Sequence, residues 1–149
     1  MHRKVVAALL AVLALGVASC GSSETTVTRA QLVSRIERAC RVAQQAAQQQ
    51  IGRAQASARR SGAALAEALV NYQRYVLARV EHVKSSDATA QSDLTAMKAA
   101  SRERLAMVER ARAAGANAQR AITAMQAQSE AVTRRIQAAL AGLGITNCV

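Results

Sequence analysis

The sequence predicts an all-α protein, built as an up-down four-helix bundle and stapled by a disulfide. Three observations favour the helical class. The 149-residue chain has no proline, and its only aromatic residues are Tyr72 and Tyr75. Alanine and glutamine, which both form helices readily, dominate the composition. Apolar or small residues recur at steps of three and four along most of the chain, which is the period of a helix that buries one face.

The chain opens with the pattern of an export signal. Residues 1–4 provide a basic start, and residues 5–17 are all apolar or glycine. This apolar run has the length of a signal-peptide core and is too short to span a bilayer. We therefore expect export from the cytoplasm, which leaves a mature chain of about 130 residues, the size of one domain.

The stretch VASC that ends at Cys20 resembles the bacterial lipobox, in which an aliphatic residue and two small residues precede a cysteine. In proteins with that pattern the thiol is diacylglycerated, and a peptidase then cuts before it. The resemblance implies a signal peptide at 1–19 and a lipidated Cys20 followed by a flexible polar tether, together 20–27. Two acyl chains would hold the protein stably on the extracytoplasmic face of the cell membrane. A plain secretory signal or an uncleaved apolar helix is the alternative.

Residues 28–149 are expected to form the helical domain. Thr28 and Gln31 have the spacing of a capping box, which starts a helix by satisfying its first backbone N–H groups. The apolar stripe of this first helix includes Cys40, which therefore points inward. A second helix is expected from about Gly62 to Lys84.

Two further helices are expected after the polar stretch at 85–93, the clearest turn signal in the mature chain. Ser92 has the side chain of an N-cap for the third helix. Gly115 offers a turn before the fourth helix, which Gly142 and Gly144 end ahead of a C-terminal tail.

The apolar stripes run nearly in phase through Gly62 and Gly115, so two architectures remain open. If both glycines lie in turns, the chain forms an up-down four-helix bundle. If both lie within continuous helices, the chain forms one long antiparallel hairpin. We favour the bundle, because the broad apolar face of the second helix suits two neighbours and because the bundle brings the tail near the first helix.

Cys40 and Cys148 remain as an even pair once Cys20 is lipidated, and an exported protein lies in an oxidising compartment. A core of alanine and medium-sized aliphatic side chains buries little apolar area, so a covalent link would help to stabilise it. We therefore expect a structural disulfide between Cys40 and Cys148. Two unrelated free thiols are the alternative, and the lack of a CxxC spacing argues against a redox-active pair.

Two stretches at the ends of the helical region resemble a loose group of exported helical proteins and lipoproteins from high-GC Gram-positive bacteria. TRAQLVSRIERACRVAQQ, which starts at Thr28, is similar to the opening helix of that group, which contains one cysteine. LAGLGITNCV, which starts at Leu140, is similar to its Gly-Leu/Ile-x-x-Cys close. The resemblance implies a structural link between Cys40 and Cys148 and no particular activity. This chain lacks the prolines that are frequent at the turns of such proteins.

No constellation of catalytic residues is recognisable in the sequence. His82 is the only histidine of the mature chain, and it lies beside Glu81 in an arrangement typical of a solvated or interhelical group. Acidic residues are scattered, no cysteine or histidine spacing suits zinc, and no glycine-rich phosphate loop occurs. We therefore expect no enzyme activity, no metal and no cofactor. An enzyme of unfamiliar type would need a pocket that combines Tyr72, Glu81 and His82.

Four arginines of the predicted third helix indicate a polyanion as a ligand. They are Arg102, Arg104, Arg110 and Arg112. Loss of the signal peptide lowers the formal charge only from +11 to +9, because Arg3 and Lys4 leave with it. Anionic lipid headgroups or wall polymers would be attracted to such a surface. Nucleic acid is not an expected partner, since the protein is exported and lacks aromatic residues on which bases stack. A solvated helix face is the alternative, and we favour it over a polyanion site.

The sequence therefore predicts a membrane-anchored bacterial lipoprotein that acts as a non-catalytic interaction or scaffold module of the cell envelope. Its expected partner is a protein of the envelope. The alternative function is electrostatic binding of anionic lipid or cell-wall polymer through arginine-rich helix faces.

Overall fold

The computed structural model describes residues 24–56 and 61–148. The predicted signal peptide at 1–19, the lipidation site Cys20 and the first part of the tether lie outside these residues. So does the stretch 57–60, which joins the first two helices.

The described chain is mostly helical, as the sequence predicts. Its elements, in chain order, are strand β1 (Thr25–Val27), helix α1 (Arg29–Ala56), helix α2 (Ser61–Val80), strand β2 (Val83–Ser85), helix α3 (Ala88–Ala113), a short 3-10 helix (Gly115–Asn117), helix α4 (Ala118–Ala124) and helix α5 (Gln126–Leu143).

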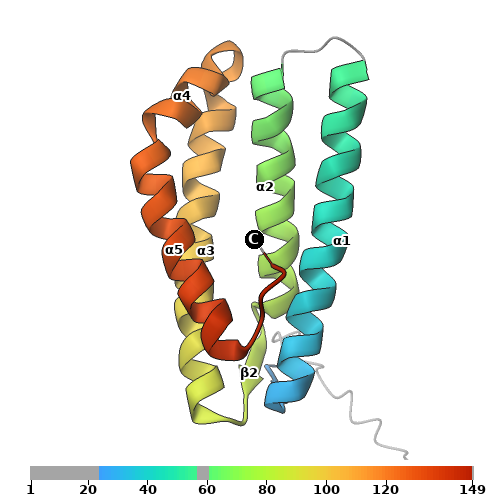
Figure 1. Cartoon of the computed structure of the whole chain (residues 1–149), viewed down its shortest axis with the longest axis vertical. Coiled ribbons are helices and arrows are strands. Elements are labelled where there is room, and N and C mark those ends of the chain that lie inside the picture. Colours follow the sequence, from blue (N-terminus) through green and yellow to red (C-terminus); the bar gives the residue numbers. More distant parts are fainter. Residues whose placement is uncertain (1–23, 57–60, 149) are drawn as a thin grey trace, which may run out of the picture.

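The long helices lie side by side, with their axes along the length of the molecule (Figure 1). Helix α1 packs against α2, α2 packs against α3, and α3 packs against α5. Helix α4 lies against the ends of α2 and α3 that are distant from the strands. Helices α1 and α5 are not packed closely on each other in the described chain, and the C-terminal tail runs back through the space between them (Figure 1).

Helix α1 begins with the predicted capping box. The backbone N–H of Thr28 donates to Oε1 of Gln31 at 3.0 Å, and the backbone N–H of Gln31 donates to Oγ1 of Thr28 at 3.3 Å. Val27 and Leu32 are both buried on either side of this start, so they pack as a hydrophobic staple. The start of α1 is also joined to the end of α5, because the Arg29 guanidinium donates to the carbonyl of Gly142 at 2.8 Å.

A two-stranded parallel sheet is the main departure from the predicted fold. Strand β1 pairs with β2 in a register that places Thr25 opposite Val83 and Val27 opposite Ser85. The structure thus differs from the expected flexible tether at Thr25–Val27, and from the expected second helix, which ends at Val80 instead of Lys84. The strands form because Val27 and Val83 both bury their side chains in the core, while the other four strand residues are polar.

The Lys98 ammonium group of α3 holds the chain segment that leads into this sheet. Its Nζ donates to the carbonyl of Glu81 and to the carbonyl of Val83, at 2.9 Å each. Burial lowers the pKa of Lys98, and the nearby Glu81 carboxylate opposes that shift.

The start of α3 corrects the predicted N-cap. Asp87, not Ser92, caps the helix, since its Oδ1 accepts a hydrogen bond of 2.7 Å from the backbone N–H of Ala90. Ser92 lies one turn inside the helix and is exposed. The polar stretch therefore contributes its first residues to the turn and its last residues to α3.

The predicted fourth helix is interrupted. Helix α4 ends at Ala124 and α5 begins at Gln126, with Met125 between them outside the helical region of backbone conformation. The predicted turn at Gly115 is confirmed, and its φ of +55° is one that glycine adopts most readily. Gly144, with a φ of +85°, is the C-cap of α5.

Gly142 has a different role from the predicted helix stop. It lies within α5, where a Cβ atom would come within 2.7 Å of the Asp93 carboxyl carbon of α3. The missing side chain therefore leaves room for the Asp93 carboxylate between α3 and α5.

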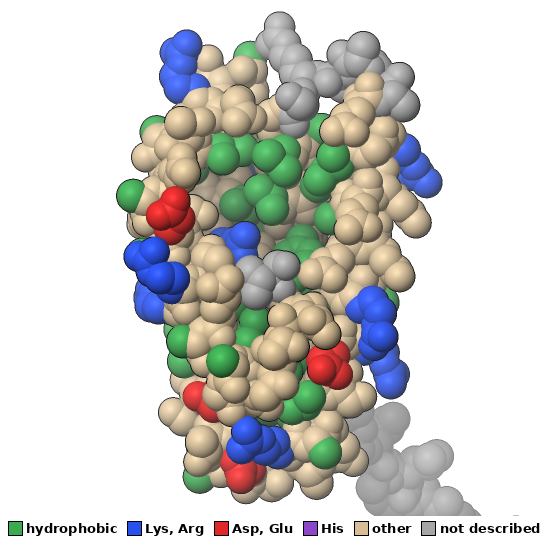
Figure 2. All heavy atoms as spheres, in the orientation of Figure 1, with side chains coloured by type: hydrophobic (Ala, Val, Ile, Leu, Met, Phe, Trp, Pro, Cys, Tyr) green, Lys and Arg blue, Asp and Glu red, His purple; other side chains and the backbone are tan. Residues whose placement is uncertain are grey.

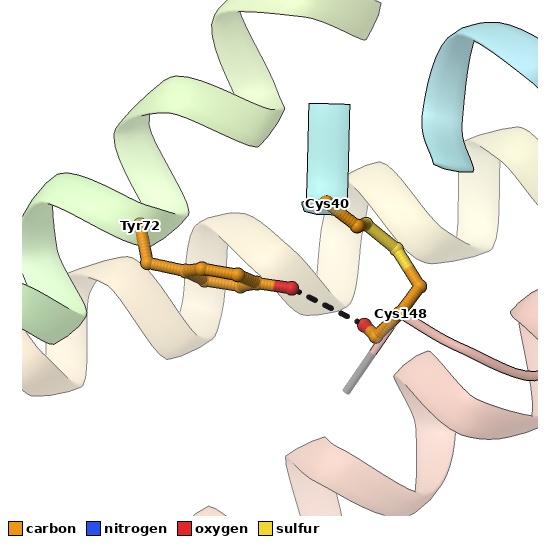
Figure 3. The surroundings of a disulfide bond; sticks show 3 residues. All are labelled: Cys40, Tyr72 and Cys148. Atoms are coloured by element: carbon orange, nitrogen blue, oxygen red, sulfur yellow. Dashed lines mark hydrogen bonds between the residues drawn. A yellow bond between two sulfur atoms is a disulfide. The ribbon is translucent and has the colours of Figure 1, made fainter. Parts of the chain in front are cut away.

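The predicted disulfide between Cys40 and Cys148 is present, and it links residues that are 108 positions apart. Cys40 is fully buried and Cys148 is 6% exposed. Figure 3 shows the Tyr72 ring pointing toward the backbone carbonyl of Cys148, and the Tyr72 hydroxyl donates to that carbonyl at 3.3 Å. The disulfide and this hydrogen bond together fix the tail to α1 and α2.

We expect removal of the disulfide to lower the free energy of unfolding by about 2 to 4 kcal/mol, since the unfolded chain gains the freedom of a long loop. Urea unfolding of the oxidised protein, with and without a reducing agent, measures this change. The double variant Cys40→Ala/Cys148→Ala is the control, because the reducing agent should not affect it. Equal unfolding midpoints for the oxidised and reduced wild-type protein would contradict the prediction.

Candidate ligand-binding surfaces

The four arginines predicted to bind a polyanion do not form one surface. Arg102 pairs with Glu81, and Arg112 lies 3.5 Å from a carboxylate oxygen of Glu67. Arg110 is exposed in the last turn of α3. Arg104 is half-buried on the inward side of the same helix. The structure therefore distributes these side chains around α3.

Ion pairs between neighbouring helices use a large part of the acidic residues. Arg74 lies 2.6 Å from Glu109 and Arg135 lies 2.6 Å from Glu103, in both cases between exposed or half-exposed side chains. Lys84 lies 2.5 Å from Glu24 beside the parallel sheet. Such exposed pairs contribute little to stability, about 0 to 1 kcal/mol each. They also neutralise charge on the faces where they lie, so the unpaired positive charge of the described residues lies on other faces.

One such face is a shallow groove between the outer sides of α1 and α2. Helix α1 contributes Arg35, Arg38 and Val42, and helix α2 contributes Tyr75 and Arg79. The Arg79 guanidinium lies 4.9 Å from the centre of the Tyr75 ring, which holds it over the groove by a cation–π contact. We call this surface the arginine groove.

The arginine groove has the chemistry of an anion site. Among the ion pairs of the described residues, none joins Arg35, Arg38 or Arg79 to a carboxylate. Val42 is 41% exposed and is the most exposed large apolar side chain in the described chain. Three guanidinium groups beside an apolar surface suit a ligand that carries both negative charge and hydrocarbon.

A second group of polar side chains lies inside the molecule, around Tyr72. Burial raises the pKa of the Tyr72 hydroxyl, and the positive charge of Arg104 opposes that shift. Burial lowers the pKa of Arg104, because it disfavours the charged guanidinium. The two side chains, from α2 and α3, therefore share one partly desolvated environment next to the tail.

The structure does not bring together the three residues that an unfamiliar enzyme would need. Tyr72 lies in the interior beside Cys148, whereas His82 is exposed between α2 and β2. Glu81 is paired with Arg102. Within residues 24–56 and 61–148, no group of three or more histidine, cysteine or acidic side chains could hold a metal ion.

None of the helices within the described ranges is both long enough and apolar enough to cross a bilayer.

No protein-family model, curated protein or solved structure matches this chain.

Proposed function

We propose that this chain is a bacterial lipoprotein, anchored through Cys20 to the extracytoplasmic face of the cell membrane, which acts as a non-catalytic interaction module of the envelope. Its domain is an up-down four-helix bundle in which α4 and α5 together form the fourth helix.

The short distance along the chain between Cys20 and strand β1 carries this proposal. Five peptide units separate Cys20 from Thr25, and they span at most about 17 Å when fully extended. Thr25 is fixed by its pairing with β2, so the β1–β2 end of the domain is the end held near the membrane. A lipid anchor would therefore present the domain in a limited range of orientations, as a module that engages a partner at the membrane needs.

The bundle topology is supported by which helices pack together. Each long helix packs on the next one along the chain, through the pairs α1 with α2, α2 with α3 and α3 with α5. The chain changes direction at Gly115, where the 3-10 helix begins. A long hairpin would instead extend α1 into α2 along one axis, which does not allow these two helices to lie side by side.

The resemblance to exported helical lipoproteins supports the assignment to the envelope. The cysteines of the two similar stretches, Cys40 and Cys148, are the ones joined by the disulfide. A buried structural disulfide suits a protein that folds outside the reducing cytoplasm.

Lipidation is tested by mass spectrometry of the protein purified from its own membrane. We expect an N-terminal peptide that begins at Cys20 and carries a diacylglyceryl thioether. The variant Cys20→Ala should carry no lipid and should not be cut at this position, whereas Ser22→Ala should be processed like the wild type. An unlipidated wild-type protein, either cut elsewhere or uncut, would overturn the anchor.

The interaction role is tested by crosslinking the anchored protein in its own membrane and identifying what is captured. We expect one envelope protein, recovered near stoichiometrically with the intact lipoprotein. Capture of lipid or wall polymer alone, released by salt, would contradict a protein partner and would favour the second function below.

The arginine groove favours electrostatic binding of anionic lipid headgroups as the second candidate function. Ala30 and Gln31, from the first turn of α1, line the groove together with Arg35 and Arg38. The groove therefore lies at the end of the domain that the anchor would hold near the membrane. Each cation close to an anionic surface contributes about 1 kcal/mol.

We expect the triple variant Arg35→Gln/Arg38→Gln/Arg79→Gln to bind anionic vesicles about 100-fold more weakly, since three such contributions are lost. Vesicle sedimentation of the chain from residue 21 onward, which contains every described element, measures this change. The control variant Arg102→Gln/Arg110→Gln/Arg112→Gln removes the same charge from α3. Equal losses in both variants, or no loss in either, would exclude the groove as the site.

A further inference from the structure

The packing of the interior changes along the length of the helices. Near the strands, the inward stripes of the helices are closely covered, and Ile36, Val80 and Ile136 are at most 5% exposed. Nearer the opposite end, positions in phase with those stripes are only half-buried, and they include Ala47, Ile51, Leu65, Leu69 and Met125. Toward that end, these apolar side chains are therefore only partly covered by the rest of the described chain.

Figure 2 shows this difference on one face of the molecule. Hydrophobic side chains line a depression in the upper half, between α4 and α5 on one side and α1 on the other. Basic side-chain atoms lie in its lower part. We call this depression the apolar hollow. The half-buried apolar side chains at this end of the helices include Ile51, Leu65, Leu69 and Met125.

The hollow exists because α1 and α5 do not pack on each other. Near the strands the tail fills the space between them, and Ile145 and Cys148 are 3% and 6% exposed. The disulfide holds the tail at the level of Cys40, near the middle of α1. Beyond that level, the described chain has no segment that fills the space.

Arg104 gives the hollow a charge as well as an apolar wall. It follows Met97 and Ser101 on the inward stripe of α3, where both of those residues are buried. None of the ion pairs of the described residues includes Arg104. Burial of part of a cation is unfavourable, and an anion bound beside it lowers that cost. The neighbouring Tyr72 hydroxyl already donates its proton to the Cys148 carbonyl, so Arg104 is the group that would hold the anion.

We propose that the apolar hollow binds a single-chain amphiphile with an anionic headgroup, placing the headgroup at Arg104 and the hydrocarbon chain against Ile51, Leu65, Leu69 and Met125. Helix α3 rises about 14 Å between Arg104 and its end at Ala113, which leaves the length of a medium hydrocarbon chain. This site is separate from the arginine groove, which lies on the outer side of α1 and α2. It does not depend on the lipid anchor.

The probe for this site is cis-parinaric acid, a fluorescent fatty acid whose emission rises in apolar surroundings. We expect saturable binding of one molecule to the chain from residue 21 onward, at least about tenfold tighter than binding of its uncharged methyl ester. If the wild-type chain bound the acid and the ester with equal affinity, that result alone would overturn the role of Arg104. Absence of saturable binding would overturn the site itself.

Two variants locate the bound molecule. Arg104→Met keeps an apolar stem without the charge, so it should weaken binding of the acid about tenfold and leave binding of the ester unchanged. Leu69→Trp should fill the hollow and weaken binding of both. Arg110→Met, on the exposed side of the same helix, is the charge-matched control and should bind like the wild type. Loss of binding in the Arg35→Gln/Arg38→Gln/Arg79→Gln variant, with full binding in Arg104→Met, would assign the molecule to the groove and overturn the proposal.

Discussion

The Cys40–Cys148 disulfide is the constraint on which the shape of the interior depends. Helices α1 and α5 lie at the two ends of a series in which each long helix packs on the next, and they do not close on one another. The disulfide draws the tail into the space between them, where Ile145 completes the core near the strands. Because it holds Cys148 at Cys40, the disulfide also fixes how far along the helices the tail reaches. The filled space near the strands and the hollow beyond Cys148 therefore have the same cause.

The helices could be predicted from the sequence because their signals are local. The capping box of Thr28 and Gln31 and the turn at Gly115 each depend on a few neighbouring residues, and both are present. The cap of α3 could not be chosen this way, since the stretch SSDATAQSD offers several capping side chains. Asp87 is selected because β2 ends just before it, and β2 forms only by pairing with β1. Strands of three residues are too short to show an alternating pattern.

The candidate ligand surfaces were harder to predict from the sequence than the helices, because they depend on how the helices pack. The arginines of α3 are close along the chain, but residues two apart in a helix point about 200° apart around its axis, so Arg102 and Arg104 face different surroundings. The arginine groove combines Arg35 and Arg38 of α1 with Arg79 of α2, and only the packing of these helices brings them together. The inward direction of Arg104 does follow from the stripe through Met97 and Ser101, and this signal was present in the sequence.

The parallel pairing of β1 with β2 has a mechanical consequence. Parallel strands that are pulled along their length resist in shear, because the hydrogen bonds between them share the load. Tension that enters from the N-terminal side meets β1 first, then the joint between Arg29 and the carbonyl of Gly142, and then Cys40. Residues 40–148 are closed into a covalent loop, so the chain within that loop cannot be drawn out. Under a pull from its N-terminal side, the protein can lengthen only by the short segment before Cys40. That segment carries Arg35 and Arg38, so the arginine groove would lose its α1 wall, whereas the helices within the disulfide loop would stay joined.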